Sequence, residues 1–204
     1  MACSLTTGRG IGCKANQGGL QNVYFGDPAE FTAASVTYDS TTGEIENTGM
    51  ASGNASIFKF ALKGANSFTT TITGSDENGT IFTEQSLAIT LQTMDHATLK
   101  EIKLLAHSRP KIFVEDRNGH LLMLGLENGM TLTTGQIVSG DAMGDLSGYT
   151  LEFSGQEKIG VIHVDAGIAN ASFVAGLATT SITLHQVTDK NSFFHCFLIW
   201  RRAV

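Results

Sequence analysis

Proline is nearly absent from this chain, with two residues in 204, whereas glycine occurs 23 times. Few segments therefore lose a backbone N–H donor and many tight turns are possible, a mixture typical of chains built from β-strands. Cysteine is also scarce. The chain has three, Cys3, Cys13 and Cys196, so they cannot all pair with one another, and their spacing does not match the C-x-x-C of zinc and redox motifs. We interpret them as reduced thiols of a protein folded in a reducing cytosol.

Positive charge is limited as well. Thirteen Lys and Arg against 19 Asp and Glu give a formal net charge of −6, and the cations do not cluster. Because a surface that grips nucleic acid needs grouped cations to neutralise phosphates, this distribution excludes tight binding to DNA or RNA.

Long hydrophobic runs are missing. No stretch reaches the roughly 18 apolar residues that a membrane span requires, and MACSLTTGRG at the N-terminus lacks the apolar core of a signal peptide. The most apolar run, Phe193 to Trp200, is shorter than a span and is followed by Arg201. We expect neither secretion nor membrane insertion, and interpret the run as a strand or a contact segment.

Motifs for catalysis and metal binding are absent from the sequence. The six histidines form neither H-x-x-x-H nor H-E-x-x-H, and no G-x-S-x-G element occurs. A metal site could assemble in space from His185, His195 and Cys196, but such residues on apolar strands are usually packed in a core. Glu115 and Asp116 are adjacent on an expected strand, so they face opposite sides and cannot share a substrate. The sequence predicts a protein without enzymatic activity, cofactor or metal.

A turn signal, by contrast, is repeated. Asn-Gly occurs at 78–79, 118–119 and 128–129, each time between runs rich in Ile, Val, Phe, Leu and Thr. Both central residues of a type I′ turn need positive φ, which Asn tolerates and Gly adopts freely, so each pair predicts a β-hairpin. Because a β-meander must bury one face, the sequence predicts a mainly β fold: an antiparallel β-sandwich or barrel in a single domain over residues 1–204.

Apolar patterning places the strands and one flanking α-helix. The helix begins after Asp95, a capping residue, and ends before Pro110. Its apolar stripe consists of Leu99, Ile102, Leu105 and Ala106. Strands are expected at 20–25, 31–38, 56–62, 67–75, 79–91, 111–117, 120–126, 130–138, 144–158, 161–165 and 181–187.

The clearest strand lies within residues 144–158. Tyr149, Leu151 and Phe153 alternate there with polar residues, so their three side chains share one face. We expect a half-buried strand with this apolar trio in the core.

Residues 39–54 form a polar, glycine-rich segment with almost no large apolar side chains. Such a segment lacks a core of its own, so it is either a surface loop or an arm that pairs on another molecule. Glu44 and Glu46 share one face of a short strand within it. We interpret that face as solvated or facing the lumen of an oligomer, rather than as a catalytic carboxylate pair.

Three features together resemble the tail tube proteins (major tail proteins) of tailed bacteriophages and the related tubes of contractile injection systems. The string CKANQGGLQNVYFGD at residues 13–27 is similar to the opening of such virion proteins. A single helix lies between β-meanders after the polar arm, and LSGYTLEFSGQEK at 146–158 is similar to a late strand of tube subunits. The likeness covers about residues 1–165, and residues 166–204 form a C-terminal extension beyond it.

The resemblance implies a structural subunit of the phage tail tube. Its architecture would be a β-sandwich or barrel with one flanking helix, assembled with itself into homohexameric rings that stack, alongside other tail proteins, around a channel for DNA passage and ejection. DNA would be passing cargo only, which fits the acidic charge because a conduit must not trap phosphate. The protein would be made in the host bacterial cytoplasm and reside in the virion, with Glu44 and Glu46 as candidate lumen-facing acids.

Two other classes stay open at this point. A carbohydrate- or cell-surface-binding β-sandwich module would also be rich in Gly and Thr, although it usually presents clustered aromatic side chains, and Trp200 is the sole tryptophan here. Another phage structural protein, from the capsid or the baseplate, is the second alternative.

Overall fold

The structure is a computed structural model that describes the backbone of residues 8–10, 14, 16–28, 31–38, 44–50 and 57–164, and their side chains except those of 31–35, 37–38 and 46–50. Several sequence-based expectations fall outside these residues: the three cysteines, the His185, His195 and Cys196 group, the strand at 181–187, the apolar run at 193–200 and the extension at 166–204.

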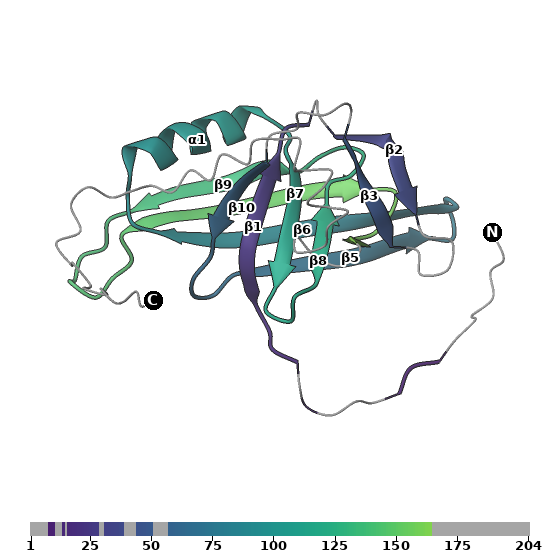
Figure 1. Ribbon diagram of the computed structural model, residues 1–204, viewed down its shortest axis with the longest axis horizontal. Helices are drawn as coiled ribbons and strands as arrows, with labels where there is room; N and C mark the ends of the chain where they lie inside the picture. The colour runs from purple at the N-terminus through teal and green to yellow at the C-terminus, as the bar shows by residue number, and fades with distance from the viewer. Residues whose placement is uncertain are drawn as a thin grey trace, which may run out of the picture.

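Two β-sheets and one helix make up the described fold (Figure 1). The larger sheet has seven strands in the order β2 (Phe31–Tyr38), β3 (Ile45–Met50), β11 (Ile162–Val164), β8 (Leu121–Leu124), β7 (Lys111–Asp116), β1 (Leu20–Gly26) and β4 (Ile57–Ala61). The smaller sheet has four, in the order β5 (Ser67–Ser75), β6 (Thr80–Gln92), β10 (Gly148–Glu157) and β9 (Thr131–Val138). Neighbouring strands are antiparallel except for the parallel pair of β3 and β11. The expected β-sandwich with one helix is confirmed, and neither described sheet closes into a barrel.

The main hydrophobic core lies between the two sheets. Figure 1 shows β1 and β7 crossing β6 and β10 steeply, as in sandwiches whose inner side chains interdigitate. Phe153 of β10 is fully buried, and the centroid of its ring lies 5.4 Å from that of Phe25 in β1. Val114 of β7 and Leu87 of β6 are equally inaccessible to solvent. Burial of such side chains contributes about 1.5–3 kcal/mol each to folding, so this layer is the principal source of stability.

A second buried cluster lies on the other face of the seven-stranded sheet. It includes Tyr24 of β1, Phe113 of β7 and Met123 of β8, all from positions that alternate with residues of the main core. Strand β7 is therefore buried on both faces from Lys111 to Val114. This explains why it reads in the sequence as a continuous apolar run rather than as an alternating one.

The helix α1 (His96–His107) lies beside β9 at one side of the sandwich (Figure 1). Asp95 caps it as expected, because its Oδ2 accepts hydrogen bonds from the backbone N–H groups of Ala97 (3.1 Å) and Thr98 (3.2 Å). Leu99, Ile102 and Leu105 pack against the core but are only partly buried. Ala106 was expected on the same stripe and is instead exposed, because the helix contacts the core along a narrow line.

The Asn-Gly pairs do not form the expected type I′ turns. Such turns need positive φ at both residues, but among the described non-glycine residues only Thr93 has positive φ. In the second pair, the N–H of Gly119 donates to the carbonyl of Asp116 at 3.3 Å, and Gly119 alone is left-handed, with φ 85°. The loop is therefore a three-residue connection that ends in a left-handed glycine, which joins β7 to β8 as a hairpin all the same.

The third Asn-Gly pair, at 128–129, does not make a hairpin at all. It connects β8 to β9, which belong to different sheets, so the continuous meander expected here is wrong. The glycine is required by a close approach: a Cβ at Gly129, where φ is 78°, would lie 2.5 Å from the carbonyl oxygen of Arg109. A local turn signal cannot distinguish a hairpin from a crossover between sheets, because Gly satisfies the backbone needs of both.

The segment at 39–54 also differs from the expected arm. Residues 45–50 form β3, which pairs with β2 and with β11 of the same chain, so this part does not need a partner on another molecule. Ile45 is fully buried in the second cluster. One large apolar side chain and two neighbouring strands suffice to hold a polar strand in a sheet. The flanking residues 39–43 and 51–54 lie outside the described residues.

Candidate assembly surface

The outer face of the four-stranded sheet is a broad polar surface, which we call the polar face. It consists of side chains that alternate with the core positions of β5, β6, β10 and β9 and that pair across the strands. Apart from the partly exposed Phe82 and Ala88, its members are polar: Thr69, Thr71, Thr73, Glu84, Ser86, Thr90, Thr134, Gln136, Thr150, Glu152, Ser154 and Gln156. The four strands contain no Lys, Arg or His, so the two acids give this face a net negative charge.

One hydrogen bond joins two side chains of the polar face, and another lies next to that face. Gln156 Nε2 donates to Glu84 Oε1 at 3.2 Å across the pair of β10 and β6, and Thr133 Oγ1 donates to the carbonyl of Glu152 at 3.0 Å beside a β-bulge. At one margin, a shallow hollow of about 430 Å³ lies between Glu84, Gln156 and Arg109. Arg109 belongs to the segment after α1 and is the cation nearest to the acids of this face among the hollow's lining residues.

The two edges of this sheet, β5 and β9, have no strand partner on their outer sides among the described strands. They are nine and eight residues long, and six residues of each are exposed. Neither contains the Lys or Pro residues with which edge strands commonly prevent pairing with another chain. The edge of β5 can therefore accept a strand from a neighbouring molecule, and β9 can do so at its exposed residues, although α1 lies beside it.

Three buried polar side chains hold the β8–β9 connection that joins this sheet to the larger one. Gln85 Oε1 accepts from the N–H of Gly125 at 2.9 Å. Lys111 Nζ donates to the carbonyls of Leu126 at 2.7 Å and Glu127 at 2.9 Å. Burial lowers the pKa of Lys111, and the carboxylates of Glu157 and Glu127 oppose that shift.

Glu157 completes this arrangement from β10. Its carboxylate is 2% exposed and accepts from the backbone N–H groups of Glu127 at 3.0 Å and Asn128 at 2.9 Å. Buried polar groups destabilise a fold unless they are paired, so these bonds specify one path for the connection. The orientation of the polar face relative to the larger sheet follows from that path.

The carboxylates selected from the sequence lie elsewhere. Glu44 is partly buried just before β3, and Glu46 is the second residue of β3, with a side chain outside the described set. Glu46 belongs to the larger sheet and Glu44 directly precedes it, so both lie away from the strands of the polar face. Tyr149, Leu151 and Phe153 are 2%, 2% and 0% exposed and face the core from the opposite side of β10 to Glu152.

Sequence reasoning missed the acids of the polar face. The signal for them was present in β6, where Glu84, Ser86 and Thr90 alternate with apolar Leu87, Ile89 and Leu91. What the sequence did not reveal is that β6 lies next to β10, so that Glu84 and Glu152 share one surface.

Glu115 and Asp116 are separated as expected and have structural partners. Glu115 Oε2 accepts from Asn22 Nδ2 at 2.7 Å and from the hydroxyl of Tyr24 at 2.9 Å. Burial, the hydrogen bond to Glu115 and the charge of Glu115 together raise the pKa of Tyr24. Asp116 instead accepts from the backbone N–H groups of Asn118 and His120, both at 2.8 Å, and so stabilises the β7–β8 turn.

Within 57–164 and the shorter described ranges, no three His, Cys, Asp or Glu side chains come together in a way that could hold a metal ion. In the same part of the chain, no helix is long and apolar enough to cross a bilayer.

Comparison with known proteins gives little likeness. No protein-family model matches the chain. No curated protein is significantly similar to it in sequence. A chain in the structure of the "Virion of native gene transfer agent (GTA) particle" is structurally similar to 52% of this chain and to 88% of its own length, with 10% sequence identity and a TM-score of 0.34. At that TM-score the likeness carries no argument about function.

Proposed function

We propose that this protein is a virion structural protein, and specifically a subunit of a phage-like tail tube in which the polar face lines a channel for DNA. The observation that carries the proposal is the polar face itself: four strands without a cation, two exposed acids, and an edge on each side with which no described strand pairs. Pairing of β5 in one copy with β9 in the next would continue the sheet from subunit to subunit.

A ring built in this way closes on itself and removes both edges. Its inner surface would carry Glu84 and Glu152 from every subunit, and hydroxyl and amide groups between them. Such a surface repels phosphate weakly and offers no grouped cations, so DNA passes without being held. The sequence resemblance to tail tube proteins supports the same assignment independently of the polar face.

Electron microscopy of the purified protein tests the proposal. Negative-stain images should show rings or tubes with a central channel. Replacement of Thr134 by Pro on β9 removes an N–H donor from an edge strand without adding charge, and should reduce ring formation. Dispersed monomers of the unmodified protein at high concentration would contradict the proposal and favour a carbohydrate- or cell-surface-binding module, or a capsid or baseplate protein.

A further inference from the structure

The turn end of the β5–β6 hairpin carries two large apolar side chains that are exposed to solvent. Ile72 and Ile81 are 69% and 68% exposed, although they lie on the face that is buried core further along the same strands. Ile72 pairs with Thr83, and Ile81 pairs with Gly74, so the two isoleucines are diagonal neighbours and form one patch. We call residues 72–81 the hairpin tip.

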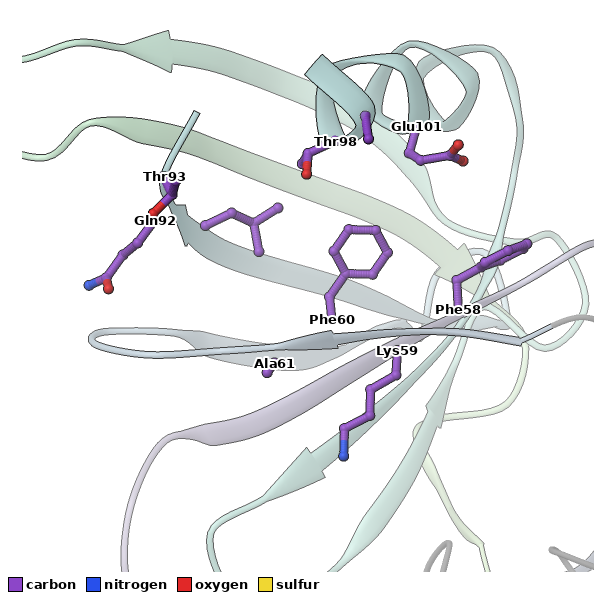
Figure 2. A pocket seen from close by; sticks show the side chains of 10 residues that line it. Phe58, Lys59, Phe60, Ala61, Gln92, Thr93, Thr98 and Glu101 are labelled. Carbon is purple, nitrogen blue, oxygen red and sulfur yellow. The ribbon is translucent and has the colours of Figure 1, made fainter. Parts of the chain in front are cut away.

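A pocket with apolar walls lies at the opposite end of the same sheet. It measures about 280 Å³ and is formed by β4, the end of β6 and the first turns of α1. Figure 2 shows Phe58 and Phe60 on one side of β4, directed toward the helix that carries Thr98. Leu91 contributes to the wall, and Phe58 is 38% exposed. The volume lies below the roughly 300 Å³ at which small-molecule sites begin, which suits aliphatic side chains better than a cofactor.

One strained residue borders the pocket. Thr93 has φ 73°, which is costly for a β-branched residue, and its N–H donates to the carbonyl of Ser147 at 2.8 Å. This bond ties the end of β6, beside the pocket, to the segment that precedes β10.

The two ends of the sheet also differ in charge. Residues 67–92, which form the hairpin, contain three acids and no cation, and Asp76 and Glu77 lie in the turn itself. The elements that form the pocket end carry two acids, Asp95 and Glu101, and three exposed lysines on the β4–β5 connection and α1: Lys63, Lys100 and Lys103. Lys59 extends to the other side of β4 from Phe60 (Figure 2). The hairpin tip and the pocket end are therefore complementary in both charge and apolar character.

These features cannot meet within one molecule. They lie at opposite ends of β6, whose 13 residues span about 40 Å at the usual rise of a strand. A contact between them must join two copies head to tail, which leaves a free tip and a free pocket at the two ends of every assembly. Docking of the tip therefore adds copies in the direction of the strands, whereas pairing of β5 with β9 adds copies in the perpendicular direction, across the sheet.

We propose that the hairpin tip of one copy docks into the Phe58–Phe60 pocket of a second copy. Ile72 and Ile81 cover the exposed aromatic wall, while Asp76 and Glu77 approach the lysines around it. The role of this docking contact rests on the proposed function. In a tail tube, docking of the hairpin tip joins successive rings, and pairing of β5 with β9 joins the subunits within a ring.

Cross-linking between two differently tagged copies tests the contact. In a background with Cys3, Cys13 and Cys196 replaced by Ser, one copy carries Ile81→Cys and the other Thr98→Cys, and a short bismaleimide is added. We expect a cross-linked heterodimer. A control pair with Thr134→Cys on the polar face in place of Ile81→Cys should not link, and adding Ile72→Ser to the first copy should reduce linking.

Assembly of charge variants provides the second arm. Ile72→Asp with Ile81→Asp should abolish stacking, whereas Asn16→Asp with Gln17→Glu adds the same charge to an exposed segment before β1 and should leave stacking intact. If the protein assembles into tubes but the Ile81 and Thr98 positions do not link, the docking contact is wrong and the proposed function stands. If the positions link but no rings or tubes form, the contact stands and the tail-tube assignment is wrong.

Discussion

The side-chain nitrogen of Lys111 lies 2.7 Å from the carbonyl oxygen of Leu126, in a part of the sandwich from which solvent is excluded. The bond fixes the segment that leads from the larger sheet to the smaller one. Since Lys111 also donates to Glu127, a single ammonium group satisfies two carbonyls of one connection. Through this connection, Lys111 helps to fix where the polar face lies relative to the larger sheet.

Replacement of Lys111 by Met should therefore destabilise the protein strongly. The change leaves two buried carbonyls and the carboxylate of Glu157 without their cation, which costs about 3 kcal/mol in the free energy of unfolding. Chemical denaturation measures this cost. Lys158→Met is the matched control, because Lys158 is exposed, and should change stability by less than about 0.5 kcal/mol. Equal losses from the two variants would contradict the proposed role of Lys111.

The two faces of β10 should respond differently to truncation. Phe153→Ala removes a fully buried ring that contacts Phe25, so a loss of about 3–5 kcal/mol is expected. Glu152→Ala removes an exposed side chain and should change the melting midpoint little. A thermal melt of each variant separates the two outcomes, and similar shifts in both would show that the face assignment is wrong.

Charge reversal on the polar face should create DNA binding. Glu84→Lys with Glu152→Lys adds two cations per subunit to an exposed surface, where single charges contribute little to stability. Assembled protein with these changes should retain duplex DNA at low salt and release it as salt rises, because counterion release governs such contacts. A filter-binding assay over a salt series measures the effect.

The same experiment discriminates between two candidate channel surfaces. Glu44→Lys with Glu46→Lys makes an equal charge change on the larger sheet, at the positions selected from the sequence. If this variant retains DNA and the Glu84→Lys, Glu152→Lys variant does not, the channel lies at β3 and the assignment of the polar face is wrong.

Acid should weaken the β7–β8 turn through Asp116. Burial alone would raise the pKa of its carboxyl, but hydrogen bonds from His120 and Asn118 outweigh that effect and hold the pKa below its ordinary value of 3.8. The stabilisation is thus fully present above pH 3.8 and is lost as the pH falls through the lower folded-state pKa. Asp116→Asn cannot titrate, so its melting midpoint should fall less steeply than that of the unmodified protein below about pH 4. Parallel curves would exclude this contribution.

Local features of the fold could be predicted from the sequence, because nearby residues determine them. The alternation of Tyr149, Leu151 and Phe153 corresponds to their burial, and Asp95 and Pro110 bracket the helix. The strand order could not be predicted in this way. Nothing near Asn128 indicates that the chain changes sheets there, because the hydrogen bonds that decide it come from the distant Lys111 and Glu157.

The candidate site shows the same limit. Glu44 and Glu46 were selected because they are close in the sequence, whereas Glu84 and Glu152 come together through the pairing of β6 with β10. Ile45 was also overlooked as a core residue, since one apolar side chain in a polar segment gives no periodic pattern.

The position of β11 determines when the protein can be completed during synthesis. Among the described strands, β11 is the one that joins the β2–β3 hairpin to the rest of its sheet, between β3 and β8. Residues 162–164 leave the ribosome after every other described strand. A nascent chain can complete the sandwich core only after β10 has been made, and its first hairpin has no place in the sheet until synthesis has passed Val164. Because closing so long a loop is entropically costly, this step is late and slow. A growing assembly would therefore receive finished subunits rather than partly translated ones.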